Sequence, residues 1–69
     1  TVIAEARLVH AKLVGINAYK VNFSQSDLRN ADLSNAELDH ACFNGARLNF
    51  TLFRGAVLTR ARLQDAQFE

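Results

Sequence analysis

A large apolar residue stands at all but one of the fifth positions of this chain, from Ile3 to Phe68, and the register never slips. Fourteen positions fall in this register, and thirteen of them hold Leu, Phe or Ile. Two residues before each of these repeat centres lies a small or β-branched residue, which is Ala in nine units. Because the pattern covers all 69 residues, we expect one domain, residues 1–69, without a linker.

Neither a helix nor a flat strand can bury residues that are spaced five apart. On an α-helix a step of five residues turns about 140°, so the centres would scatter around the axis. On a strand an odd step sends successive centres to opposite faces. Each unit must therefore be a short extended segment followed by a bend, with the centre and the small residue both pointing inward. The sequence predicts a solenoid that turns a corner every five residues.

The last position of each unit holds the residues that suit a bend. Asn30 and Asn35 occupy this slot, which favours a backbone with positive φ. All three glycines occupy it as well: Gly15, Gly45 and Gly55.

The segment "ADLSN", residues 31–35, closely resembles the A(D/N)LXX consensus of the pentapeptide-repeat family, and the resemblance extends over all 69 residues. It implies an all-β fold, namely a right-handed quadrilateral β-helix with four units per coil. This chain would then form about three and a half coils. Many members of that family have no assigned role, and they occur in bacteria, abundantly in cyanobacteria, and in plastids.

The inward positions define the predicted core. Ala18 is the one small centre, and we expect its bulky inward neighbours Ile16 and Val21 to restore the missing volume. Inward hydroxyls should hydrogen-bond to backbone carbonyls at the corners, and they belong to Thr1, Ser26 and Thr51. The core repeat centres are Leu8, Leu13, Phe23, Leu28, Leu33, Leu38, Phe43, Leu48, Phe53, Leu58 and Leu63.

Residues twenty apart should stack on adjacent coils at about 4.8 Å, which sorts the surface into columns. Arg7, Asp27 and Arg47 form one column of alternating charge, and Lys12 lies over Asp32. Opposite charges on adjacent strands favour the register by up to about 1 kcal/mol each. The second coil also carries an acidic belt, made of Asp27, Asp32 and Glu37. We interpret these charges as serving register and solubility, with an acidic docking patch as the alternative.

Lys20, His40 and Arg60 form a basic column on one side of the predicted solenoid. Stacked basic groups could contact phosphates. However, the net charge is only +1, and Tyr19 is the one aromatic residue beside the column. We therefore interpret the column as a solvated face and do not expect nucleic acid as a partner.

The remaining reactive residues do not form a recognisable site. Cys42 is the single cysteine, so the chain cannot form an internal disulfide. One cysteine and two histidines make a structural zinc site improbable, and we expect no metal and no cofactor. His40 and Cys42 flank an inward Ala41, with Asp39 nearby, but a core filled with Leu and Phe leaves no pocket for catalysis. We expect no enzyme.

Several apolar residues occupy outward positions, where folding does not require them. Phe50 and Leu52 flank the inward Thr51, and Val57 lies on the neighbouring face. These three are the candidate partner surface. Outward apolar residues near the other end are Val2, Val9, Val14 and Tyr19. Incidental exposure, or cover by residues outside this sequence, remains the alternative.

The resulting functional hypothesis is a non-catalytic protein-interaction or scaffolding module. The family resemblance adds an alternative, a DNA mimic that binds DNA gyrase and protects it from quinolones, although the basic residues here interrupt the acidic rows such a mimic needs. We expect no membrane insertion, because no apolar run approaches about 20 residues. A protein partner of unknown identity is also expected, and a cytoplasmic location is taken as the default. The chain starts without Met and stops within the repeat, so we expect a fragment or trimmed form of a longer chain, or an end-to-end homodimer.

Overall fold

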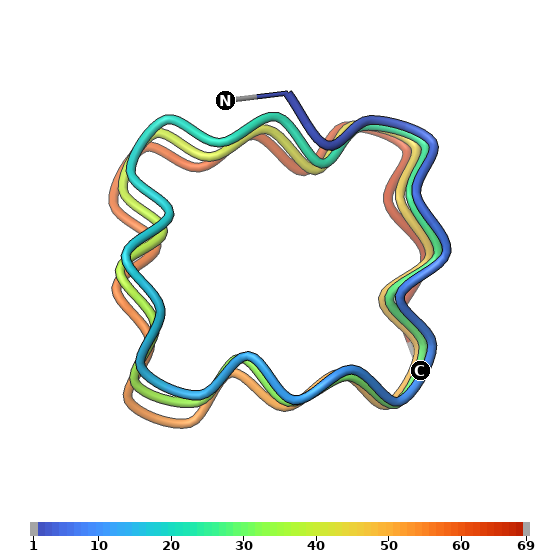
Figure 1. Cartoon of the computed structure of the whole chain (residues 1–69). Coiled ribbons are helices and arrows are strands. Elements are labelled where there is room, and N and C mark those ends of the chain that lie inside the picture. Colours follow the sequence, from blue (N-terminus) through green and yellow to red (C-terminus); the bar gives the residue numbers. More distant parts are fainter. Residues whose placement is uncertain (1, 69) are drawn as a thin grey trace.

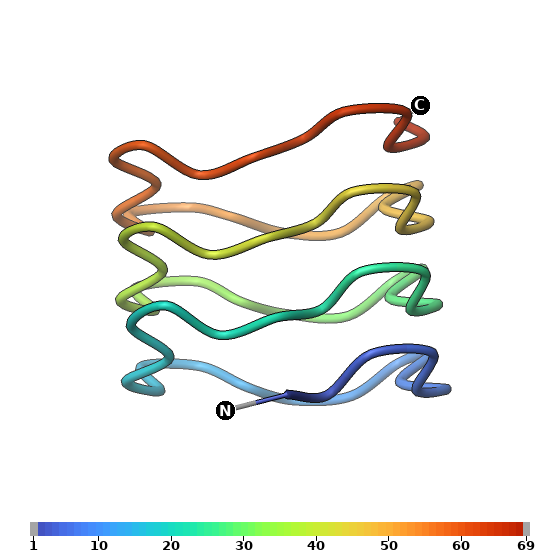
Figure 2. The same ribbon diagram turned by 90° about the horizontal axis from the view of Figure 1, so that it is seen from above.

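A computed structural model describes residues 2–68 of the chain. Viewed down its axis, the chain traces a square, and the coils lie almost directly over one another (Figure 1). Seen from above, the coils stack as separate layers from the N-terminus to the C-terminus (Figure 2). The Cα trace measures 20 × 20 × 19 Å, so the stack is about as tall as it is wide.

The extended segments are too short to form continuous strands. Residues 2–68 contain no helix, and the β-structure consists of parallel bridges of one residue each. Ten bridges run from Val2↔Asn22 to Arg47↔Gln67, one for each step of five residues, and each joins residues twenty apart. A coil is therefore twenty residues long and has four sides.

Backbone hydrogen bonds join each side to the coils before and after it. At the unit centred on Phe23, the Phe23 amide donates to the Cys42 carbonyl at 2.7 Å, and the Gln25 amide donates to the Asn44 carbonyl at 2.9 Å. In return, the Cys42 amide donates to the Val21 carbonyl at 2.9 Å. The same pattern recurs along the middle coils, so the stack is a ladder of inter-coil bonds interrupted only by corners.

Each corner is a tight turn that ends in a left-handed residue. For the centres from Leu8 to Leu63, the amide three residues after a centre donates back to that centre's carbonyl, as Ser26 does to Phe23 at 3.1 Å. The fifth residue of every unit from 5 to 65 has a φ between 59° and 73°. An i→i+3 hydrogen bond with positive φ only at i+2 is the signature of a type II turn. At Gly55 the Asn35 side chain also fills the space a Cβ would need.

In the middle coils, the inter-coil ladder and the turn leave one amide per unit without a backbone acceptor: the one directly after each centre. Where the second position of the unit is Asn or Asp, its side chain can accept from this amide. The Ser24 amide donates to Asn22 Oδ1 at 2.9 Å, and the Ser34 amide donates to Asp32 Oδ1 at 3.0 Å. Asn and Asp form such turns readily because the side chain reaches the amide two residues on. This hydrogen bond gives a physical reason for the D of "ADLSN".

The middle coils hold the core. Phe23, Leu28, Leu33, Leu38, Phe43 and Leu48 are each at most 1% exposed. Leu8, Leu13, Phe53 and Leu58 are partly buried against that cluster. Within the core the Phe23 and Phe43 rings stack at 5.5 Å, and Phe43 meets Phe53 edge-on at 5.9 Å. Leu63 differs from the prediction, because it is 39% exposed rather than buried, and Phe68 is 56% exposed. Both lie in the last coil, whose outer face no described coil covers.

Inward hydroxyls bond as the sequence predicted. Ser26 Oγ donates to the Ile3 carbonyl at 2.8 Å and accepts from the Ala6 amide at 3.2 Å. Thr51 Oγ1 donates to the Leu28 carbonyl at 2.6 Å. The predicted bond of Thr1 falls outside the described residues. These hydroxyls let a polar residue occupy an inward position without an unsatisfied group.

A hollow of about 180 Å³ lies beside Ala18. Its lining includes Ile16, Val21 and Phe23 together with the exposed Asn17 and Tyr19, so it opens to the surface at the first coil. The predicted compensation of Ala18 by Ile16 and Val21 stays a prediction.

Leu33→Asp and Phe50→Asp should separate inward from outward positions. Leu33 is fully buried, and an unpaired carboxylate there costs several kcal/mol, which is a large part of the stability of a small domain. We expect Leu33→Asp to abolish the β-rich far-UV circular dichroism spectrum. Phe50 is 62% exposed, so Phe50→Asp should change the free energy of unfolding by less than about 0.5 kcal/mol. Parent-like melting of Leu33→Asp would contradict the inward assignment.

Asn22→Ala should destabilise the protein by about 1 kcal/mol, because the partly buried Ser24 amide loses its acceptor. Asn22→Asp keeps the acceptor oxygen and should remain close to the parent. Cys42→Ala is the matched control, since Cys42 occupies the same column one coil later and cannot accept in this way. Urea unfolding of the three variants measures these differences, and equal losses in Asn22→Ala and Cys42→Ala would disprove the role of the Asn22 side chain.

Candidate functional site

The candidate partner surface is exposed. Phe50 is 62% exposed, Leu52 50% and Val57 41%. Phe50 occupies a corner, while Leu52 and Val57 occupy bridge positions, where the residue between two inward positions faces out. The Leu52 amide donates to the Ala31 carbonyl at 2.9 Å, and the Val57 amide donates to the Ala36 carbonyl at 3.0 Å. The backbone beneath these side chains is therefore fixed by the ladder.

A second set of apolar side chains is exposed on the first coil. Its members are Val2, Val9, Val14 and Tyr19, with exposures from 39% to 74%. Tyr19 differs from the others because its ring contacts polar neighbours. It packs against the His40 ring at 5.6 Å between centroids, and Lys20 Nζ lies 5.3 Å from its centroid.

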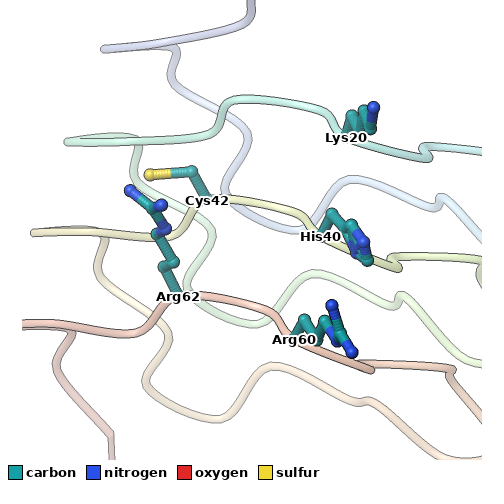
Figure 3. Close-up of a pocket in the computed structure, with 5 residues that line it drawn as sticks. All are labelled: Lys20, His40, Cys42, Arg60 and Arg62. Atoms are coloured by element: carbon teal, nitrogen blue, oxygen red, sulfur yellow. The ribbon is translucent and has the colours of Figure 1, made fainter.

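The basic column forms one wall of a groove. Lys20, His40 and Arg60 come from three successive coils and lie one above another (Figure 3). Cys42 and Arg62 line the other side, and the groove has a volume of about 460 Å³. The sequence predicted the basic column but not the contribution of Arg62 to the groove. The signal was present, because Arg62 lies two residues after Arg60 and twenty after Cys42.

Cys42 and His40 do not form the arrangement that thiolate catalysis needs. In Figure 3 the Cys42 sulfur points toward the Arg62 guanidinium and away from His40. Cys42 is partly buried, as its bridge to Arg62 on the next coil implies. Within residues 2–68, no group of three or more His, Cys, Asp or Glu side chains is arranged to hold a metal ion.

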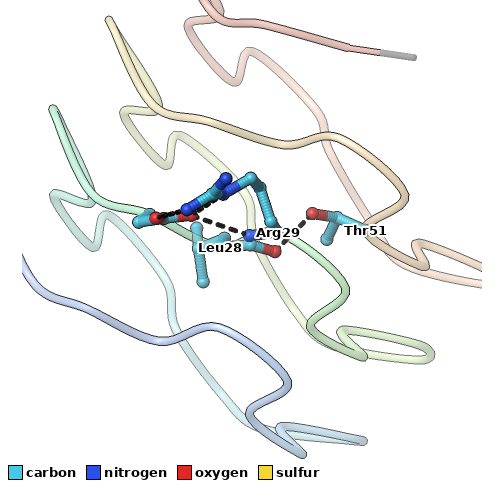
Figure 4. A network of polar contacts seen from close by, with 4 residues as sticks. Leu28, Arg29 and Thr51 are labelled. Carbon is cyan, nitrogen blue, oxygen red and sulfur yellow. Dashed lines mark hydrogen bonds and ion pairs between the residues drawn. The ribbon is translucent and has the colours of Figure 1, made fainter.

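The acidic belt contains the ion pair found in residues 2–68. Arg29 Nη2 lies 2.6 Å from Asp27 Oδ2, and Arg29 Nε donates to Asp27 Oδ1 at 2.8 Å. Figure 4 shows Arg29 in this network, next to the bond from Thr51 to the Leu28 carbonyl. We expected opposite charges to pair across coils. The backbones of Arg7, Asp27 and Arg47 do form β-bridges on adjacent coils, but the Asp27 side chain forms its ion pair with Arg29 of its own coil instead. A carboxylate two residues before an Arg can meet both sides of its fork without spanning the gap between coils.

These contacts shift the pKa of two carboxyl groups. The side-chain hydrogen bonds from Arg29, aided by its charge and that of Arg47, lower the pKa of Asp27 from 3.8 to about 2. Hydrogen bonds from Ser34, followed by the charges of Arg54 and Lys12, lower the pKa of Asp32. Both carboxylates therefore stay charged at a lower pH than an ordinary Asp side chain does.

A family model described as pentapeptide repeats matches residues 3–35, 11–49 and 43–69. The chain belongs to the pentapeptide-repeat family. Pentapeptide repeats generally form a right-handed quadrilateral β-helix, and proteins built from them are generally non-enzymatic structural or interaction proteins. A search of curated proteins found no match. Residues 2–68 of this pentapeptide-repeat chain include no helix of the length and apolar character that a membrane crossing requires.

Acid should remove the contribution of Asp27 to stability. Its folded pKa of about 2 lies below the ordinary 3.8, so its stabilising contribution is present above pH 3.8 and disappears as the pH falls toward 2. We expect the free energy of unfolding, measured with urea, to fall over this range. In Asp27→Asn, which keeps an Oδ1 acceptor, the fall should be smaller. In Arg29→Ala the carboxyl pKa, followed by NMR, should move back up. A parent-like pH profile in Asp27→Asn would refute this assignment.

Proposed function

We propose that the chain is a non-catalytic protein-interaction module, a right-handed quadrilateral β-helix of about three and a half coils that binds a protein partner through Phe50, Leu52 and Val57. The proposal rests on the backbone conformation and the exposure of Phe50. Its φ is 61°, and its side chain is 62% exposed. A bulky residue with positive φ is strained, and this strain is not offset by burial. A phenyl ring that is 62% exposed adds little to the core, whereas a partner could bury it.

The rest of the surface supports a preorganised contact. Leu52 and Val57 project from backbone that is hydrogen-bonded to the previous coil. A partner that buries them does not have to order a loop first, which lowers the entropic cost of binding. Aromatic residues are also the side chains that most often dominate protein interfaces.

The course of the chain supports the proposed hand. In Figure 1 the chain runs clockwise while it passes from the near blue coil to the more distant red coil. This is the sense of a right-handed coil, and it agrees with the general geometry of the family.

A DNA mimic that binds gyrase is the less favoured function. Such a mimic needs acidic rows along a DNA-like length. The largest Cα dimension is 20 Å, which corresponds to about six base pairs at 3.4 Å per step. Its acidic belt is confined to the second coil, and the third coil carries Arg47, Arg54 and Arg60.

Affinity capture with paired baits tests the proposal. The baits are the parent, Phe50→Asp/Leu52→Asp, and Val9→Asp/Val14→Asp as a matched control on exposed apolar residues of the first coil. We expect a protein that is retained by the parent and the control but lost by Phe50→Asp/Leu52→Asp, because two carboxylates would be buried unpaired at the interface.

Three other outcomes would count against the proposal. Equal capture by all three baits would place the contact elsewhere. Loss in both variants would indicate a general apolar surface rather than the Phe50 corner. Capture of gyrase, lost on substitution of the acidic belt, would favour the DNA mimic. Light scattering of the parent alone identifies the case in which the partner is a second copy of the chain.

A further inference from the structure

The groove lined by Lys20, His40, Cys42, Arg60 and Arg62 is separate from the Phe50 corner. Corners recur every five residues, and four corners complete a coil. Position 50 and positions 40 and 60 are therefore two corners apart, on opposite corners of the square. The groove needs an explanation of its own.

Its corner differs in composition from the other three. The fifth residues of the units form four columns, and three of them contain Gly or Asn, which tolerate positive φ. The remaining column consists of Lys20, His40 and Arg60, with φ of 59°, 61° and 59°. Lys and Arg do not favour this conformation, although His is among the residues enriched in it, and like charges stacked on adjacent strands repel one another. Neither effect stabilises the fold, so folding alone does not account for the column.

The charges of the groove are not neutralised within the part of the chain that the structure describes. The ion pair there joins Asp27 to Arg29, on another face. Asp39 precedes His40 in the chain, but it is not among the residues that line the groove. Arg62 adds a second guanidinium from the adjacent side, as Figure 3 shows. Three permanent cations and a histidine therefore face one hollow of about 460 Å³, within the size range of small-molecule sites.

Two of the basic side chains are held in place. Lys20 Nζ lies 5.3 Å from the centroid of the Tyr19 ring, and the His40 ring packs against the same ring at 5.6 Å. Tyr19 thus acts as a support between successive coils. Below them the Lys20 amide bonds to the Asp39 carbonyl at 2.9 Å and the His40 amide to the Thr59 carbonyl at 2.8 Å, so the rows cannot slide.

We propose that this groove binds an oligophosphate, the linked phosphate chain shared by inorganic polyphosphates and nucleoside triphosphates. Guanidinium groups bind phosphate oxygens in pairs, and a lysine adds a point charge. Three rows at about 4.8 Å present the basic groups in one line, and the long Lys and Arg side chains can converge on a ligand that carries several anionic groups in close succession. A single phosphate would reach only part of the column.

Two other polyanions fit the groove less well. An acidic peptide offers carboxylates only on alternate residues of one face, which are spaced more widely than the rows of this groove. Single-stranded nucleic acid binds through free aromatic platforms on which bases stack. Here the one adjacent ring, Tyr19, already contacts Lys20 and His40.

Calorimetric titration of the parent with tripolyphosphate at about 0.15 M salt tests the proposal, because screening at this ionic strength suppresses non-specific attraction. Arg60→Gln and Arg62→Gln should each weaken binding about tenfold, the effect of losing one charged hydrogen bond of about 1.5 kcal/mol. Arg54→Gln removes the same charge on another face and should bind like the parent. Circular dichroism establishes that all variants are folded.

Cys42 provides a second readout at the groove itself. It is the only cysteine and is partly exposed, so alkylation by iodoacetamide reports on access to the groove. Tripolyphosphate at a concentration equal to the parent's Kd should slow alkylation in the parent and in Arg54→Gln. The effect should be much smaller in Arg60→Gln, because a tenfold weaker site is only about a tenth occupied at that concentration. Binding that leaves the alkylation rate unchanged would place the ligand elsewhere and overturn the proposal.

Further ligands distinguish the source of the phosphate. Weaker binding of inorganic phosphate than of tripolyphosphate is expected, and equal binding would refute the need for a chain. If ATP binds as tightly as tripolyphosphate, nucleoside triphosphates are a source of the bound phosphate chain. If ATP binds more weakly, inorganic polyphosphate is the source. Tighter binding of hexaglutamate or of a six-nucleotide single-stranded DNA would overturn the oligophosphate assignment. The assignment would also be overturned if tripolyphosphate did not bind, or if Arg54→Gln lost as much affinity as Arg60→Gln and Arg62→Gln.

Discussion

The hydrogen bonds between successive coils are the constraint on which the rest of this structure depends. Each side of the square contributes only a single-residue bridge, yet amides of every unit in the middle coils bond to the coils on either side. These bonds can form only if each coil contains the same number of residues and each corner bends alike. The five-residue unit satisfies both conditions, because its last residue adopts positive φ whether it is Gly, Asn, Lys or Phe. The ladder, rather than the preference of the corner residue, decides the backbone there.

Much of the fold could be predicted from the spacing of Leu and Phe, since only a chain that bends every five residues brings them all inward. The exposure of Leu63 in the last coil could not be predicted in this way. Leu63 has the same local pattern as Leu33, but no described coil covers its outer face. The repeat pattern also could not predict which charged side chains form ion pairs. The columns correctly place Asp27 between Arg7 and Arg47, but a rotamer of Arg29 decides which pair forms.

The candidate sites follow the same division. Periodicity identified which side chains face out, including Phe50, Leu52 and the basic column. It did not identify the groove, because that depends on how Arg62 and Cys42 extend across the side next to the column. The role of Asn22 was hidden for a related reason, since the orphaned amide at Ser24 becomes visible only when every other amide has its acceptor.

The unit that builds the core and the unit that aligns the surface differ in length. Five residues suffice to keep Leu and Phe inward, but twenty are needed to return to the same side. A duplication of one unit between residues 45 and 46 would therefore be almost silent for the core. It would nevertheless turn everything after it by one side of the square, so that Arg60 and Arg62 no longer lay over His40 and Cys42. Such a chain can create or dissolve a surface site by a change in length alone, without altering the identity of any residue in it.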